Sequence, residues 1–179
     1  MKGARQDSFR LAGATILALM NSELDSILNE FNLLTIQYLA LFAGPRTERT
    51  AWLRRVEIAI ADLYAAGLRL PLTEPSDQDA PTMPIEDRRR LAIDISERMG
   101  GDSTPYSIVF HPRDLDETPV VGTLVDDLES IYEDLNEGTA LLAAGGSAED
   151  VIWAWHVNFQ IHWGRHALGA LQALQDMLR

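Results

Sequence analysis

Apolar side chains recur at three- and four-residue steps along most of this 179-residue sequence. That spacing lines one face of an α-helix, whereas a strand alternates at every second residue. The clearest segment runs from about Asn21 to Ala43 and closes at Gly44-Pro45, a helix stop followed by a turn. The pattern predicts an all-α fold. Its regularly spaced apolar residues are Leu24, Ile27, Leu28, Phe31, Leu34, Tyr38, Leu41 and Phe42.

Two further helices follow before the middle of the chain. Thr47 has the chemistry of an N-cap, and we expect it to open a helix that reaches Ala66-Gly67. A third helix is expected from about Ile85 to Met99. Residues 71–84 hold four prolines among short polar residues, so we interpret them as a Pro-rich loop.

Residues 102–121 are expected to be irregular because they contain three more prolines. Tyr106 to Phe110 is the only β-like stretch there. An isolated strand cannot form a sheet, so we interpret it as an extended segment packed on the helices.

Two capping patterns mark the C-terminal helices. Thr123 precedes Asp126 by three residues, as in a capping box, and the helix that it opens should reach Ala144. Ser147 and Asp150 repeat the pattern and open a helix that runs nearly to the C-terminus. The glycine pair between them predicts an antiparallel helical hairpin. The whole chain is therefore expected to be a bundle of five or six helices.

We expect residues 1–179 to form a single α-helical domain, with residues 1–20 as a loosely packed N-terminal extension. Lys2, Arg5 and Arg10 precede an apolar run and loosely resemble a signal peptide, but Asp7 interrupts the basic region. No window reaches the ~18–20 apolar residues of a membrane span. A cytoplasmic location is the expectation, and the lack of cysteine fits a reducing compartment.

The formal net charge of −12 argues against nucleic acid and anionic membranes as partners. A nucleic-acid binder neutralises phosphates with clustered basic side chains. The only basic cluster, residues 88–90, is flanked by Glu86 and Asp87. An acidic helical surface instead suits a protein partner with a basic surface. The sequence leaves the oligomeric state open.

Candidate functional residues gather in the last two helices. At 100° per residue, His162 and His166 project toward the apolar side of the final helix. Asp127 and Asp134, seven residues apart, lie on the flank of the preceding helix's apolar stripe. With Trp163, these residues form a candidate buried polar cluster.

Two interpretations of this cluster stay open. In the first, each histidine donates to a carboxylate or a backbone carbonyl and fixes the hairpin's register, so that His162→Ala costs ~1–3 kcal/mol. In the second, the His-x-x-x-His spacing of His162 and His166 binds a divalent metal such as zinc or manganese, with Asp127 or Asp134 as an oxygen ligand. A small-ligand pocket among the tryptophans is a third possibility.

The C-terminal part of the chain also resembles a known family. The runs Asp126-Asp127-Leu128, Ile131-Tyr132 and His162-Trp163-Gly164, followed by His166-Ala167, are similar to a bacterial domain-of-unknown-function family of small helical proteins, number 5063 in the usual series. The resemblance covers about residues 106–170. It implies a helical fold and a bacterial, cytoplasmic origin, and it implies no activity.

No complete catalytic motif is present in the sequence, and no cofactor is expected. We therefore expect a non-enzymatic helical protein-interaction or scaffold protein. The alternative is a metal-binding or metal-dependent hydrolytic bundle that uses His162 and His166 with Asp127 or Asp134.

Overall fold

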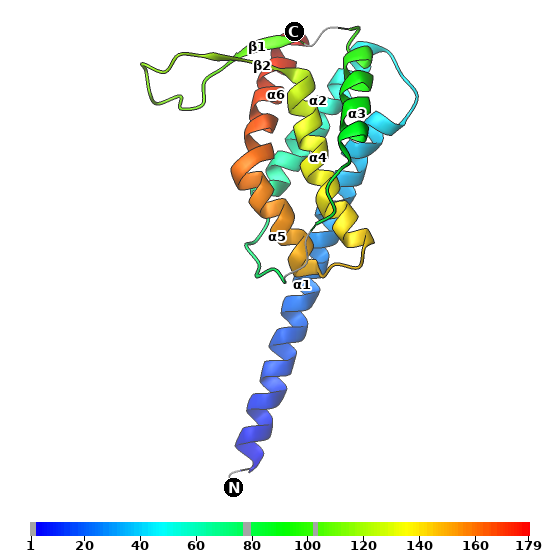
Figure 1. The fold of residues 1–179 in the computed structure, drawn as a ribbon. Coiled ribbons are helices and arrows are strands. Elements are labelled where there is room, and N and C mark those ends of the chain that lie inside the picture. Colours follow the sequence, from blue (N-terminus) through cyan, green and yellow to red (C-terminus); the bar gives the residue numbers. More distant parts are fainter. Residues whose placement is uncertain (1–2, 77–79, 102–103) are drawn as a thin grey trace.

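The computed structural model describes residues 3–76, 80–101 and 104–179, with side chains described from residue 22 onward. Within these residues the chain forms six α-helices, one short π-helical segment and a two-stranded sheet (Figure 1). The predicted all-α class and the bundle of five or six helices are confirmed. None of the described helices combines the length and the apolar character that crossing a bilayer requires.

Helix α1 spans Gly3–Ala43, so the predicted start at Asn21 is wrong. Its first half is rich in alanine and leucine, which favour helix, and no proline stops the backbone before Gly44-Pro45. This half runs away from the end of the bundle (Figure 1). The loose packing expected of residues 1–20 concerns side chains that lie outside the described residues.

Helix α2 spans Arg49–Gly67 and α3 spans Ile85–Arg98, close to the predicted bounds. The cap of α2 is Glu48 and not Thr47. The Glu48 carboxylate accepts from the backbone N–H groups of Thr50 and Ala51, each at 2.8 Å, and its charge also complements the helix dipole. Residues 71–76 and 80–84 between the two helices have no regular structure, as expected of the Pro-rich loop.

The predicted irregular segment contains a sheet. Strand β1, Pro105–Ile108, pairs antiparallel with β2, Val120–Thr123, in a register that places Tyr106 opposite Gly122. The expectation of an isolated extended segment is therefore wrong. Strand β2 has only four residues and follows Pro119 directly, so its sequence was too short to show a strand pattern. The chain between the strands projects sideways from the bundle (Figure 1).

The predicted helical hairpin is present. Helix α4, Leu124–Ala143, is capped by Thr123, whose hydroxyl accepts from the N–H of Asp126 at 3.2 Å. Helix α5, Ala148–Asn158, begins at a complete capping box of Ser147 and Asp150. Gly145, between them, has a φ of 88°, a left-handed conformation that glycine adopts without a Cβ penalty.

The last helix continues past α5 but changes pitch. A π-helical segment, η1, covers Phe159–Trp163, and α6 covers Gly164–Met177. Trp155, Phe159, Trp163 and Ala167 are all buried and lie four residues apart. Each four-residue step advances an α-helix by about 400°, so three steps would rotate the stripe by about 120° off its face. The wider π turn reduces this drift and keeps the stripe buried.

Helix α4 lies at the centre of the bundle, where it contacts α1, α3, α5, α6 and β2. The core is dominated by Trp155 and Trp163, both with 0% of their surface exposed. Gly138 on α4 makes room for the first of these, since a Cβ there would lie 2.2 Å from the indole Nε1 of Trp155. The tryptophan stripe thus fixes how closely α4 and the last helix approach.

Candidate functional site

Two aspartates of α4 face two histidines of the last helix. Asp127 and Asp134 are separated by two helical turns, and His166 on α6 and His162 on η1 lie opposite them. Because α4 contacts both η1 and α6, each histidine meets its own aspartate. The structure therefore brings together the two aspartates and two histidines that the sequence predicted.

The first pair is Asp127 and His166. His166 Nδ1 lies 2.9 Å from Asp127 Oδ1, and the Tyr106 hydroxyl donates to Asp127 Oδ2 at 2.5 Å. The Asp127 side chain is 2% exposed and that of His166 is 24% exposed. The hydrogen bond to Asp127 raises the pKa of His166 despite its partial burial. Burial and the Asp127 carboxylate raise the pKa of Tyr106, so this hydroxyl stays protonated as a donor.

The second pair is Asp134 and His162, whose Oδ2 and Nδ1 atoms lie 2.7 Å apart. Burial raises the pKa of Asp134, and the contact with His162 opposes that shift. The His162 side chain is 46% exposed, so the expectation that this ring is buried is wrong. The sequence-based placement of His162 assumed a rotation of 100° per residue, as in an α-helix. His162 lies in the π turn, where that angle does not hold.

The two imidazole rings are neighbours. Their centroids are 4.8 Å apart and their planes meet at 73°. Both histidines use Nδ1 for their aspartates, and neither Nε2 atom has a hydrogen-bond partner among the described residues. A neutral histidine that donates through Nδ1 carries its lone pair on Nε2. The arrangement can accept a proton or a metal ion at these atoms.

The predicted cluster also included Trp163, which the structure places elsewhere. Its ring is fully buried against Phe159, with centroids 4.8 Å apart. Its indole Nε1 is 3.4 Å from the backbone oxygen of Trp155, at the long end of hydrogen bonding. Trp163 therefore belongs to the apolar core beneath the histidines.

Sequence reasoning missed two residues of the site. Tyr106 reaches Asp127 from β1, 21 positions away, and no local pattern signals that contact. Asp126 is exposed, and one donor atom each of Asp126, Asp127 and His166 lies within 4.8 Å of the others. The Asp126-Asp127 pair at a helix start was a visible signal, but a helix dipole explains such acids equally well.

The exposure of His162 lowers the cost expected for its removal. We expect His162→Ala to reduce the free energy of unfolding by about 1 kcal/mol, the low end of the cost of leaving a buried acceptor without its partner, because the ring is half exposed while Asp134 is buried. Urea unfolding near neutral pH measures the difference. A loss above ~2 kcal/mol would mean that the buried Asp134 carboxylate has no other partner to replace the hydrogen bond from His162.

The raised pKa of His166 predicts a pH-dependent contribution to stability. The folded protein favours the protonated ring, so this contribution is complete below the unfolded pKa of about 6.5 and is lost as pH rises through the folded-state pKa. The gap in unfolding free energy between wild type and His166→Gln should therefore shrink with rising pH, measured by urea unfolding with a chelator present. Asp127→Asn should abolish this trend. A gap that widens with pH contradicts the assignment.

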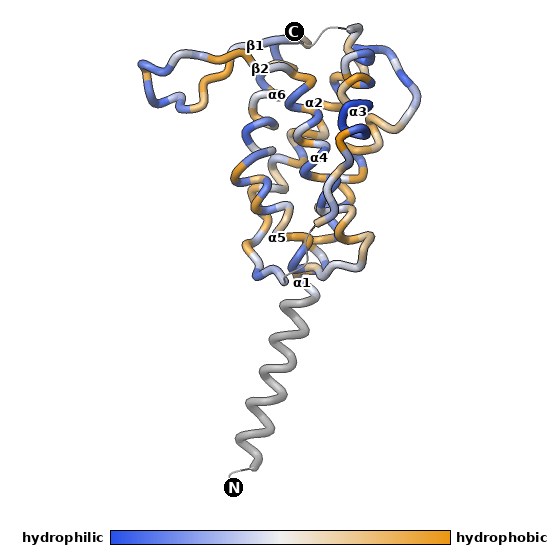
Figure 2. The backbone as a smooth tube through the Cα atoms, in the orientation of Figure 1, coloured by the Kyte–Doolittle hydropathy of each residue, from blue (hydrophilic) through white to orange (hydrophobic). Residues whose placement is uncertain are grey.

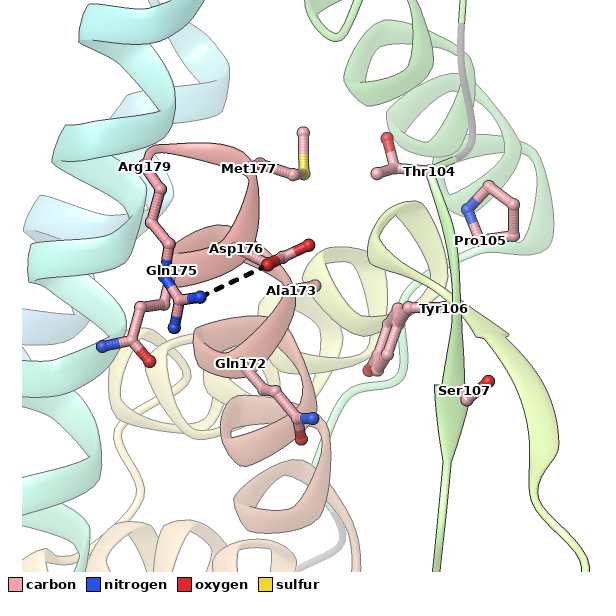
Figure 3. Close-up of a pocket in the computed structure, with 10 residues that line it drawn as sticks. All are labelled: Thr104, Pro105, Tyr106, Ser107, Gln172, Ala173, Gln175, Asp176, Met177 and Arg179. Carbon is pink, nitrogen blue, oxygen red and sulfur yellow. Dashed lines mark ion pairs between the residues drawn. The ribbon is translucent and has the colours of Figure 1, made fainter.

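A cavity of about 330 Å³ lies beside the site, between β1 and the end of α6 (Figure 3). Tyr106 forms one wall, and Asp176 and Arg179 on the facing wall form an ion pair at 3.8 Å. No tryptophan lines this cavity, so the pocket expected among the tryptophans does not correspond to it. The remaining lining residues are Thr104, Pro105, Ser107, Gln172, Ala173, Gln175 and Met177.

Comparison with known proteins extends the resemblance seen in the sequence. The family model described as Domain of unknown function (DUF5063) matches residues 22–179, well beyond the predicted 106–170. A crystal structure of protein BF1032 from Bacteroides fragilis has a similar fold, with a TM-score of 0.71 and 19% sequence identity. The similarity covers 87% of this chain and 94% of that one. No curated protein matches this chain.

Proposed function

This chain belongs to the domain-of-unknown-function family DUF5063, and we propose that it is a non-enzymatic cytoplasmic protein that binds a protein partner with a basic surface. The observation that carries the proposal is the projecting segment of residues 109–121, which we call the hairpin arm (Figure 1). It displays exposed apolar side chains, including Leu115 at 93% and Val121 at 77%. Hydrophobic and hydrophilic residues both occur along this arm (Figure 2). Val109, Phe110 and Val120 are also exposed on this arm.

Apolar side chains on one projecting arm favour association. Single exposed apolar residues are ordinary, whereas a group of them on one element marks an interaction surface. Fully burying a valine, leucine or phenylalanine side chain against a partner contributes about 1.5–3 kcal/mol. Burying these five side chains gives a gain of the same order as the cost of association, which is roughly 4–15 kcal/mol.

The arm also holds a defined shape. The Glu117 carboxylate accepts from the backbone N–H groups of Phe110 and His111, at 2.8 and 2.6 Å. The same carboxylate contacts the His111 ring at 3.1 Å. Asp114 accepts from the N–H of Asp116 at 3.1 Å. A loop ordered before binding loses less conformational entropy on binding.

Charge selects the class of partner. The chain carries a net charge of −12, and the arm contains three acids, Asp114, Asp116 and Glu117, against one arginine, Arg113. Two copies of the same acidic arm would repel each other, whereas a basic surface would be attracted.

The one basic run is also compensated within the fold. Arg88 pairs with Glu129 and Glu133 on α4, and the next two arginines pair with acids one turn earlier on α3. This charge pattern favours a basic protein over a nucleic acid.

A pair of matched variants tests the proposal. Leu115→Ser with Val121→Ser removes the two most exposed apolar side chains of the arm, and Ile93→Ser, 59% exposed on α3, is the control. Each tagged protein is expressed in the bacterium that naturally contains this protein. The masses and isoelectric points of the proteins that co-purify with it are then measured at low and high salt.

We expect wild type and Ile93→Ser to retain the same basic partner, the arm variant to lose it, and high salt to weaken the complex. A partner retained by the arm variant would contradict the proposal. Self-association that the arm variant abolishes would contradict it too, because it would identify a second copy as the occupant.

A further inference from the structure

We propose that His162 and His166 form a binding site for one late first-row divalent metal ion, with Zn²⁺ as the probe. The ion binds to the two Nε2 atoms, and Asp134 and Asp127 orient the rings without touching the metal. This site is separate from the hairpin arm, so the proposal does not depend on the proposed interaction function.

The tautomer of both histidines favours metal binding at Nε2. Each ring presents Nδ1 to a carboxylate that is at most 10% exposed, at 2.7 Å for His162 and 2.9 Å for His166. Donation from Nδ1–H leaves the lone pair on Nε2 and makes that atom a better metal ligand. Metal-bound histidines in proteins almost always have such a second partner. Both partners are already in place here.

Both histidine side chains are accessible from solvent. The His162 and His166 side chains are 46% and 24% exposed, so an ion reaches both rings from solvent. Two nitrogen ligands leave the remaining positions of a tetrahedral ion to water. The site is thus open, unlike a structural zinc site that the protein closes.

The distance between the two imidazole rings fits one shared metal ion. In a complex with an N–metal bond of about 2.0–2.1 Å, an imidazole centroid lies roughly 3.2 Å from the ion. Two such rings with centroids 4.8 Å apart subtend an angle of about 100° at the ion, near the tetrahedral value. This spacing is taken from the ring distance itself, because His162 lies in the π turn, where the geometry of an α-helical i, i+4 pair does not apply.

Another donor set competes for the ion. Asp126, Asp127 and His166 have one donor atom each within 4.8 Å of one another. However, Asp127 already accepts from Tyr106 and from His166, one bond on each oxygen. An ion bound between Asp127 and His166 Nδ1 would have to break the 2.9 Å hydrogen bond. A carboxylate-rich set also favours Mg²⁺ or Ca²⁺, whereas imidazoles favour Zn²⁺ and Ni²⁺.

Isothermal titration with Zn²⁺ and with Mg²⁺ tests the proposal on the full chain. The variants are His162→Gln and His166→Gln in the proposed site, Asp126→Asn in the competing set, and His111→Gln as a control that removes an exposed histidine of the arm. Circular dichroism and urea unfolding verify that each variant folds. His162 is half exposed, so its variant keeps the fold and the test valid.

We expect one equivalent of Zn²⁺ to bind wild type, Asp126→Asn and His111→Gln alike, and Mg²⁺ not to bind. Each of His162→Gln and His166→Gln should weaken Zn²⁺ binding at least ~10-fold. Asp134→Asn, which removes only a positioning carboxylate, should weaken it by about 10–100-fold while His162 remains. A wild type that does not bind Zn²⁺, or His162→Gln with unchanged affinity, overturns the proposal. A loss in Asp126→Asn equal to that in His166→Gln overturns it in favour of the competing set.

Discussion

Replacing Trp155 by alanine is expected to lower the free energy of unfolding by about 3–5 kcal/mol, the range for removing a buried tryptophan. The ring is fully buried, its centroid lies 4.9 Å from that of Phe31, and its Nε1 donates to the Leu135 backbone oxygen at 3.0 Å. Its removal leaves a cavity and removes one of the hydrogen bonds to the Leu135 carbonyl, which still accepts from the Thr139 hydroxyl at 3.2 Å. Urea unfolding followed by far-UV circular dichroism measures the loss.

The half-buried Trp153 provides the control, and Trp153→Ala should cost clearly less. A second comparison uses Gly138, where an added Cβ would lie 2.2 Å from the Trp155 ring. Gly138→Ala should be costly in wild type and nearly harmless in a Trp155→Ala background, which a double-mutant cycle detects. Additive costs would show that the two residues do not share this contact.

The second large effect is expected for Asp127→Ala, which should cost about 2–4 kcal/mol. The carboxylate is 2% exposed and accepts from both Tyr106 and His166, so its loss leaves two donors without their partner. The cost is below that of a fully buried pair because both donors keep some exposure to water.

The neighbouring residue makes the matched control. Asp126 is exposed in the same first turn of α4, so Asp126→Ala should lose only about 0.3–1 kcal/mol of helix-dipole interaction. Thermal and urea unfolding of both variants measure the difference. Equal losses would mean that the first-turn charge, and not the hydrogen bonds of Asp127, stabilises this end of the helix.

The helices of this protein were predictable because their signals are local. Thr123, Ser147 and the glycine pair between the last helices lie within a few residues of the helix ends that they define. Apolar spacing then identified the buried faces, including Phe31 and Tyr38 on α1. Local signals failed where two side chains could serve one role, as Glu48 took the cap expected of Thr47.

The sheet and the π turn were not predictable, because their causes lie far apart in the sequence. Strand β2 is defined by its pairing with Pro105–Ile108, across the whole hairpin arm. The π turn allows Phe159 and Trp163 to be buried together against other helices.

The candidate site followed the same division. The flank positions of Asp127 and Asp134 and the i, i+4 histidines were visible in the sequence, and the structure joins them as two pairs. The exposure of His162 depends on the π turn, and the part played by Tyr106 depends on the sheet. Both lie outside the reach of a helical wheel.

The change of pitch in the last helix lets one continuous rod serve two neighbours. Before it, α5 packs on α1, and after it, α6 packs on α2, while α4 contacts both halves. The π turn changes the angular position of the α6 side chains relative to those of α5. The five residues of η1 thus act as a joint between two packing surfaces, and they set the rotation at which the α6 half faces α2 and α4.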